Sequence, residues 1–146
     1  MWSPLFYYVR KVKLAERKDI DGKTFALGVG QVAIGLNCHD VKVVDLRGIS
    51  PATDFFVIAT STSARQGRTV CDKIMEFARE NGIARFGLAG YEQGKWVLID
   101  FVDVVVHIFD EEYRSYYELE TLWGDAKKLE IPSAEKGAEH KDESDV

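Results

Sequence analysis

Cysteine, histidine and proline are scarce in this chain, and their scarcity excludes several kinds of site. There are two cysteines, three histidines and three prolines in 146 residues. Cys38 and Cys71 form neither a C-x-x-C motif nor a zinc-ligand spacing, and no histidine lies four residues from another. We therefore expect two reduced, partly buried thiols, no metal site and no disulfide framework.

Long apolar runs are also missing. No stretch approaches the ~20 apolar residues that a membrane-spanning helix needs. The longest apolar stretch near the start covers residues 5–9, and positive charges follow it. A secretory signal has the opposite order, with its charges first. We expect a cytoplasmic protein that has no membrane partner.

Positive charge is the smaller share of the charge balance. The 19 Lys and Arg residues face 24 Asp and Glu residues, which gives a formal net charge of -5. Proteins that bind nucleic acid through its phosphates usually carry a basic surface, because counterion release supplies the affinity. We therefore expect no direct nucleic-acid readout, and a basic protein surface is the complementary partner.

The body of the chain has an ordinary globular composition, whereas its two ends differ. The apolar fraction is 46%, and the length fits one domain. Aromatic residues and then a basic run fill the first 18 positions, and charged and small residues follow Pro132. The first 18 residues are either an extension without fixed structure, which a start codon placed too early would also produce, or a short arm that touches a membrane surface or RNA. We predict an extension over 1–23, a domain over 24–130 and a disordered charged tail over 131–146.

Hydrophobic periodicity predicts three helices, which alternate with a group of two strands and a group of three strands. A first helix is predicted by apolar residues at spacings of four, three and four: Phe25, Val29, Val32 and Leu36. A second helix follows the cap at 61–63 and ends near 80, and a third covers 111–123 after Asp110. Strands are predicted over residues 41–46, 55–60, 86–91, 96–101 and 104–109. This order indicates a single α/β or α+β domain with a mixed sheet covered by helices.

Glycines interrupt the first predicted helix. Gly28, Gly30 and Gly35 lie between the apolar positions of this helix. Each lowers helix stability by roughly 1 kcal/mol relative to Ala, unless it permits close packing against the sheet. Both interpretations stay open from the sequence.

Carboxylates gather near the predicted strand ends, at Asp45, Asp54, Asp100 and Asp103. Magnesium-dependent nucleotidyl transfer would use such groups in pairs on one face of a strand, at a spacing of two. Asp100 and Asp103 are three apart, so they would point to opposite faces of an uninterrupted strand. No glycine-rich phosphate loop precedes a helix. We expect each Asp to cap a strand end or a turn.

Two aromatic residues at the ends of one predicted strand have two possible roles. Trp96 is either a core residue or an exposed anchor for a partner, because Trp is enriched among residues that dominate binding energy. Phe101 has the same ambiguity and points to the opposite face of an ideal strand. His107 is a lone histidine on the next strand, typical of a hydrogen-bonded structural residue or a contact residue.

Three blocks of sequence together resemble the ribosomal silencing factor family, also called the Iojap family. They read D-V-K-V-V-D-L-R-G-I-S-P-A-T-D-F-F-V-I-A-T-S-T-S-A-R-Q over 40–66, W-V-L-I-D-F-V-D-V-V-V-H over 96–107 and Y-Y-E-L-E-T-L-W over 116–123. The resemblance covers about residues 24–123. It implies a mixed five-stranded sheet flanked by helices, like that of nucleotidyltransferases but without the catalytic motif, and hence no enzyme activity and no cofactor.

The resemblance also implies a partner and a surface. The family binds ribosomal protein fourteen of the large ribosomal subunit, blocks the small subunit sterically and so represses translation; its members are often homodimers when free. The implied partner-binding positions are Trp96, Asp100, Phe101, Asp103 and Arg65. Val102 departs from the family, which usually has Gly there, and Val resists the positive φ that Gly permits. A nucleotidyltransferase-like enzyme and a large-subunit assembly factor are the alternative functions.

Overall fold

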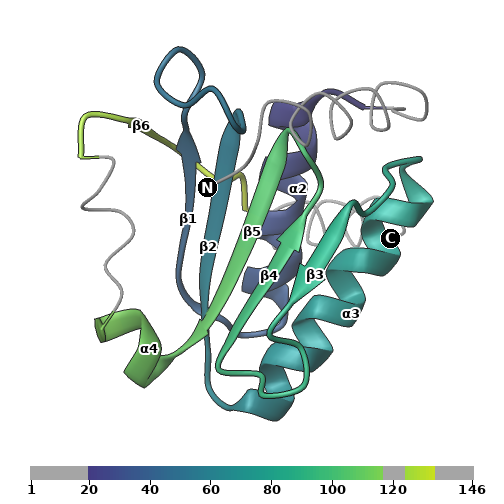
Figure 1. Ribbon diagram of the computed structural model, residues 1–146, viewed down its shortest axis with the longest axis vertical. Helices are drawn as coiled ribbons and strands as arrows, with labels where there is room; N and C mark the ends of the chain where they lie inside the picture. Colours follow the sequence, from purple (N-terminus) through teal and green to yellow (C-terminus); the bar gives the residue numbers. More distant parts are fainter. Residues whose placement is uncertain (1–19, 117–123, 134–146) are drawn as a thin grey trace, which may run out of the picture.

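The computed structural model describes residues 20–116 and 124–133. The predicted arm, residues 117–123 of the last predicted helix and most of the predicted tail lie outside the described residues. The elements (Figure 1) are α2 Gly22–Gly35, β1 His39–Asp45, β2 Phe55–Ser61, α3 Ala64–Glu80, β3 Gly87–Ala89, β4 Trp96–Asp100, β5 Val104–Asp110, α4 Glu111–Tyr116 and β6 Lys127–Leu129.

The strands form one mixed sheet in the order β3-β4-β5-β2-β1-β6. Strands β2 and β5 pair in parallel at its centre, and the four other pairings are antiparallel. All five predicted strands are present, and the predicted mixed sheet is confirmed. The sheet has one strand more than predicted, because β6 joins the free edge of β1. This strand has three residues, two of them lysines, and so shows no apolar period.

Local capping sets the starts of the helices. The Asp21 side chain accepts from the backbone N–H of Thr24 at 2.7 Å, and Ser63 Oγ accepts from that of Gln66 at 3.0 Å. Asp110 Oδ1 accepts from the N–H of Tyr113 at 2.8 Å, which confirms the predicted cap of the last helix. Gly82, at φ +71°, follows the end of α3.

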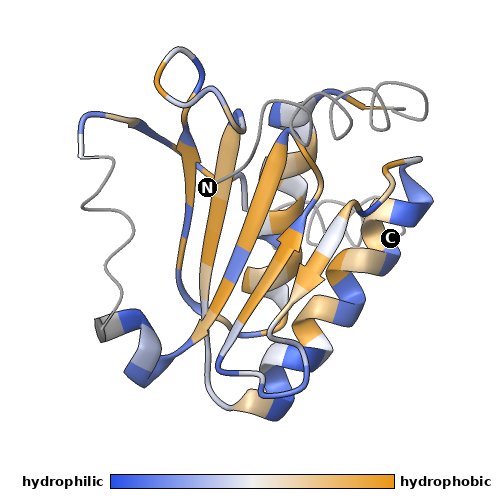
Figure 2. Ribbon diagram, viewed as in Figure 1, coloured by the Kyte–Doolittle hydropathy of each residue, from blue (hydrophilic) through white to orange (hydrophobic). Residues whose placement is uncertain are grey.

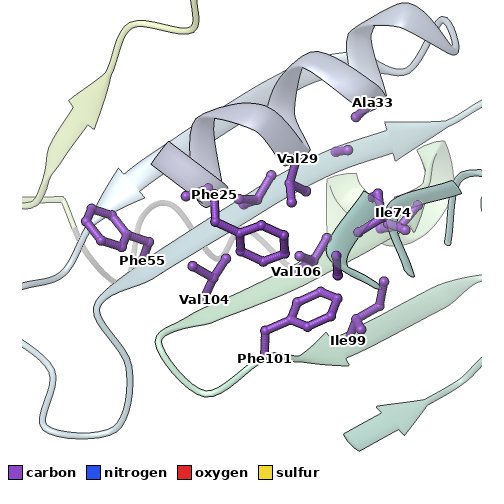
Figure 3. Packing of buried hydrophobic residues seen from close by; sticks show 14 of the residues in the cluster. Phe25, Val29, Ala33, Phe55, Ile74, Ile99, Phe101, Val104 and Val106 are labelled. Atoms are coloured by element: carbon purple, nitrogen blue, oxygen red, sulfur yellow. The ribbon is translucent and has the colours of Figure 1, made fainter. Parts of the chain in front are cut away.

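The larger part of the core lies between the sheet and two helices. Helices α2 and α3 cover the same face of the sheet (Figure 1). Phe25 of α2 meets Phe101 edge to face, with ring centroids 5.0 Å apart (Figure 3). Gly28 lets α2 approach α3, since a Cβ there would lie 2.5 Å from the Phe77 ring. The close neighbour at Gly28 is therefore a helix and not the sheet. The expected close packing against the sheet is found at Gly30, where a Cβ would lie 3.3 Å from Val43 of β1.

A smaller cluster lies on the opposite face, which we call the second face. Its members are Val44, Leu46, Ile58, Phe109 and Ala126, with the half-buried Phe56, Trp96 and Tyr113 packed against them. Strand β2 is buried on both faces apart from Phe56, as is typical of a continuous apolar run. The apolar centre of the sheet is seen in Figure 2.

Helix α4 is tied to the second face by a buried cation. Arg114 is 7% exposed. Its Nη1 donates to Thr60 Oγ1 at 2.8 Å and its Nη2 donates to Asp40 Oδ2 at 2.9 Å. These bonds connect α4 with β1 and β2 and fix the direction in which the chain leaves β5.

Both cysteines are free thiols, as predicted. Burial raises the pKa of Cys38 to about 11 and, with a smaller contribution from the charge of Asp72, the pKa of Cys71 to about 12. Both thiols are therefore protonated and weakly nucleophilic at neutral pH. Within residues 20–116 and 124–133, no helix has the length and apolar content to cross a membrane.

Candidate functional site

Strand β4 and the turn that follows it carry four of the five candidate residues. Alternation along the strand places Trp96 and Asp100 on the second face, and Phe101 on the face that α2 and α3 cover. Trp96 and Asp100 stand at opposite ends of β4, about 13 Å apart along the strand. The candidates therefore form two separate groups, one at each end of β4.

Arg65 belongs to the group at the Trp96 end. It is exposed in the first turn of α3. The preceding residue, Ala64, packs against the turn before β4: its carbonyl oxygen would lie 2.6 Å from a Cβ at Gly94. A side chain at position 94 would thus push the start of α3 away from the start of β4.

Trp96 is half-buried and held by two neighbours on β5. Its ring stacks on Phe109, with centroids 5.0 Å apart and an interplanar angle of 30°. Its Nε1–H donates to His107 Nδ1 at 3.1 Å. The indole is thus partly a core group and partly a surface group, so the two alternatives of the sequence both describe it.

His107 is a hydrogen-bonded structural residue, one of the two roles expected for it, but the sequence did not reveal its partner. Its side chain is 5% exposed, and burial lowers its pKa to about 4, so the ring is neutral. Because Nδ1 accepts from Trp96, the proton lies on Nε2, which has no hydrogen-bond partner in the described part of the chain. His107 orients Trp96. The antiparallel register Leu98↔His107 that brings the two together is not readable from spacing alone.

Asp100 and Phe101 are buried at the other end of β4. The Asp100 side chain is 4% exposed, and its Oδ1 accepts from the Val102 N–H at 2.8 Å. Phe101 is 1% exposed, and Figure 3 shows its ring turned toward Phe25. Neither side chain is accessible to a partner in this conformation. Asp103, by contrast, is half-buried and lies at the tip of the turn.

Two of the predicted carboxylates, those of Asp45 and Asp100, accept hydrogen bonds of the kind expected for turns and strand ends. Asp45 accepts two hydrogen bonds from the Arg47 guanidinium, at 3.0 and 2.7 Å, and these lower its pKa. The backbone N–H of Asp54 donates to the Asp103 carbonyl at 3.0 Å and so connects the start of β2 with the turn after β4. In the described residues, no group of three or more His, Cys, Asp or Glu side chains could hold a metal ion.

The turn end of β4 is acidic. A Cβ at Gly22, next to Asp21, would lie 3.6 Å from the Cβ of Asp103. The hydrogen bonds that the Arg47 guanidinium donates to Asp45, and then the negative charges of Asp45, Asp54 and Asp21, raise the pKa of Arg47. Asp21, Asp54 and Asp103, with the Asp45–Arg47 pair beside them, form what we call the acidic end.

Sequence comparison identifies relatives over most of the domain. Residues 25–146 match the family model described as ribosomal silencing factor during starvation. The ribosomal silencing factor RsfS of Halalkalibacterium halodurans is 45% identical over 93 residues, which are 64% of this chain and 80% of that protein. The chloroplastic Iojap protein of Arabidopsis thaliana is 31% identical over 114 residues, 78% of this chain and 48% of that protein. These names denote no enzyme activity.

Solved structures agree with this assignment. A crystal structure of a Chromobacterium violaceum protein has a TM-score of 0.69 and 27% identity, and the match covers 78% of this chain and 92% of the other. A crystal structure from Bacillus halodurans has a TM-score of 0.62 and 36% identity, covering 75% and 96%. The family match, the two relatives and the shared fold lead to one conclusion: the chain belongs to the ribosomal silencing factor (Iojap) family.

Proposed function

We propose that this protein binds the large ribosomal subunit through ribosomal protein fourteen, keeps the small subunit from joining and so represses translation in the cytoplasm. The observation that carries the proposal is the match of residues 25–146 to the ribosomal silencing factor family. The action is steric, so it needs no catalytic residue and no cofactor. When free, the protein is proposed to form a homodimer.

The acidic end supports a basic protein partner. Asp21, Asp54 and Asp103 gather there, and Arg47 is engaged by Asp45. Complementary charge steers partners together and disfavours wrong ones. The formal net charge of -5 opposes direct binding to RNA phosphates. A basic ribosomal protein suits this surface better than ribosomal RNA does.

The burial of the candidates divides their proposed roles. Asp103 and Arg65 are accessible enough to touch a partner directly, as is the uncovered part of Trp96. Asp100 and Phe101 are buried and support the surface from beneath. Trp96 offers a preorganised anchor because its ring is already fixed by Phe109 and His107.

Co-sedimentation with purified large subunits tests the binding step. The wild type is expected to sediment with the subunits, and Asp103→Lys is expected to bind about tenfold more weakly, the equivalent of about 1.4 kcal/mol. Added salt is expected to weaken the wild type's binding more than that of the variant, because the contact is electrostatic.

Glu130→Lys is the matched control. It makes the same charge change at an exposed residue just after β6, about 19 Å from β4 across four strand spacings. Its binding should match the wild type. Equal binding by the two lysine variants would contradict a role for the acidic end, and a wild type that stays in the supernatant would contradict the proposed function itself.

A further inference from the structure

Val102 has a backbone conformation that valine strongly disfavours. Its φ is +77°, while the side chain is 1% exposed. A β-branched residue at positive φ is a steric outlier, because its Cβ crowds the backbone. Three residues, Phe101, Val102 and Asp103, join β4 to β5, and Val102 is the middle one. Hairpin turns favour glycine at positions with positive φ.

The turn around Val102 is closed by several hydrogen bonds. The N–H of Asp103 donates to the Phe101 carbonyl at 3.1 Å, which makes a three-residue turn centred on Val102. The Phe101 N–H donates to the Val104 carbonyl at 2.9 Å. The Asp103 carbonyl accepts from both Asp54 and Phe55 at 3.0 Å. The turn is therefore fixed from β2 as well as from its own hairpin.

The Asp100 carboxylate holds the strained residue directly. Its Oδ1 accepts from the Val102 N–H at 2.8 Å, and the side chain is 4% exposed. A hydrogen bond in a buried position is electrostatically stronger than one exposed to water. The bond acts on the residue whose φ is unfavourable, so it opposes relaxation of Val102 to negative φ.

We infer that Asp100 is a positioning residue that keeps Val102 at positive φ and thereby fixes Asp103 at the tip of the acidic end. Its contribution to partner binding, which rests on the proposed function, passes through the turn and not through direct contact. Strained residues persist only where the surrounding structure determines them, and they cluster at functional sites. Asp103 follows Val102 directly, so a change of φ at Val102 would redirect its carboxylate.

Thermal unfolding of Val102→Gly and Val102→Ala tests the strain. Both variants remove the two methyl groups of Val102 from the core, and the Gly variant also lacks the Cβ. Only Gly accepts positive φ without cost. Val102→Gly is expected to melt about 3 °C or more above Val102→Ala. If φ at position 102 were negative, the Ala variant would be the more stable of the two. A higher melting temperature for Val102→Ala than for Val102→Gly would therefore contradict the strained turn.

Amide hydrogen exchange tests the positioning without any partner. In Asp100→Ala, exchange of the Asp103 amide is expected to accelerate about tenfold or more, because the turn loses its clamp. Asp100→Asn keeps the oxygen acceptor and should exchange like the wild type. In Asp100→Ala/Val102→Gly, the Asp103 amide should be protected again, since Gly needs no clamp. Unchanged Asp103 exchange in Asp100→Ala would overturn the positioning role.

Binding to large subunits tests the functional part of the inference. Asp100→Ala is expected to bind about tenfold more weakly, and the added Val102→Gly change is expected to restore most of the affinity. If Asp100→Ala lowers the affinity equally with Val and with Gly at position 102, Asp100 acts through direct contact with the partner, and the inference is contradicted. If the wild type does not bind, the proposed function fails, while the exchange and melting results still decide the role of Asp100.

Discussion

Trp96 owes its orientation to two neighbours on β5. Phe109 supplies a stacking surface, and His107 Nδ1 accepts the indole N–H at 3.1 Å. Phe56 packs edge-on against the His107 ring at 4.8 Å. At the scale of the residue, the surface property of Trp96 therefore depends on a buried neutral histidine, and the protonation of that histidine has a consequence for stability.

Stability is predicted to fall as the pH drops from about 6.5 to about 4. Burial lowers the pKa of His107 from 6.5 to about 4, so within this window the unfolded chain takes up a proton that the folded one does not. Above pH 6.5 both states are neutral, and the full stability is present. The expected loss is on the order of 3 kcal/mol, to be measured as the free energy of unfolding in urea between pH 7 and pH 4.5.

His107→Gln is the control for this prediction, because glutamine still offers an acceptor and does not titrate. Its unfolding free energy should change less over the same range. Asp45, whose pKa is lowered mainly by its hydrogen bond with Arg47, contributes below about pH 4 and does so in both proteins. Parallel pH profiles for the wild type and the variant would show that His107 is not the group responsible.

At the scale of the element, the packing of α2 against α3 depends on one glycine. A Cβ at Gly28 would lie 2.5 Å from the Phe77 ring, whereas a Cβ at Gly35 in the same helix meets nothing within 4 Å. Gly28→Ala is therefore predicted to lower the free energy of unfolding by about 1–3 kcal/mol, as overpacking does. Gly35→Ala should raise it by up to about 1 kcal/mol, as helix propensity predicts.

Urea unfolding of the two alanine variants checks this pair. The substitution is identical and only the surroundings differ, so opposite signs isolate the close approach of the helices. Two stabilising substitutions would mean that Phe77 moves aside without cost, and that Gly28 is not needed for packing.

The predictability of the elements followed the strength of their periodic patterns. The central strands β2 and β5 are long and apolar, and α2 and α3 have clear apolar faces and caps, so their existence was readable from the chain. Strand β6 was not, because its two lysines give no period and its pairing with β1 joins positions more than 80 residues apart. Ile131 then packs at Gly30 of α2, a contact equally invisible to local patterns.

At the scale of the whole molecule, the candidate site was only partly predictable. The sequence pointed to Trp96 and to the carboxylates around the β4–β5 turn. It could not tell that Phe101 and Asp100 are buried, because that depends on how α2 and the sheet meet around residues far apart in sequence. The link between Trp96 and His107 and the positive φ of Val102 likewise arise only in the assembled sheet.

Charge is also distributed at the scale of the molecule. Asp21, Asp54 and Asp103 come from three separate parts of the chain. They meet at the acidic end because α2 and β2 begin there and β4 ends there. The fold thus collects carboxylates into one surface that the net charge alone does not reveal. A basic partner would meet complementary charge at this surface.

The joining of purified ribosomal subunits tests the proposed steric block. Large subunits are incubated with the protein, small subunits are added at modest magnesium concentration, and the joined ribosomes are separated on a sucrose gradient. Joined ribosomes are expected to decrease as the protein occupies large subunits, and Asp103→Lys is expected to require a higher concentration for the same effect. If large subunits carrying the protein join small subunits as fully as bare ones do, the steric block is contradicted.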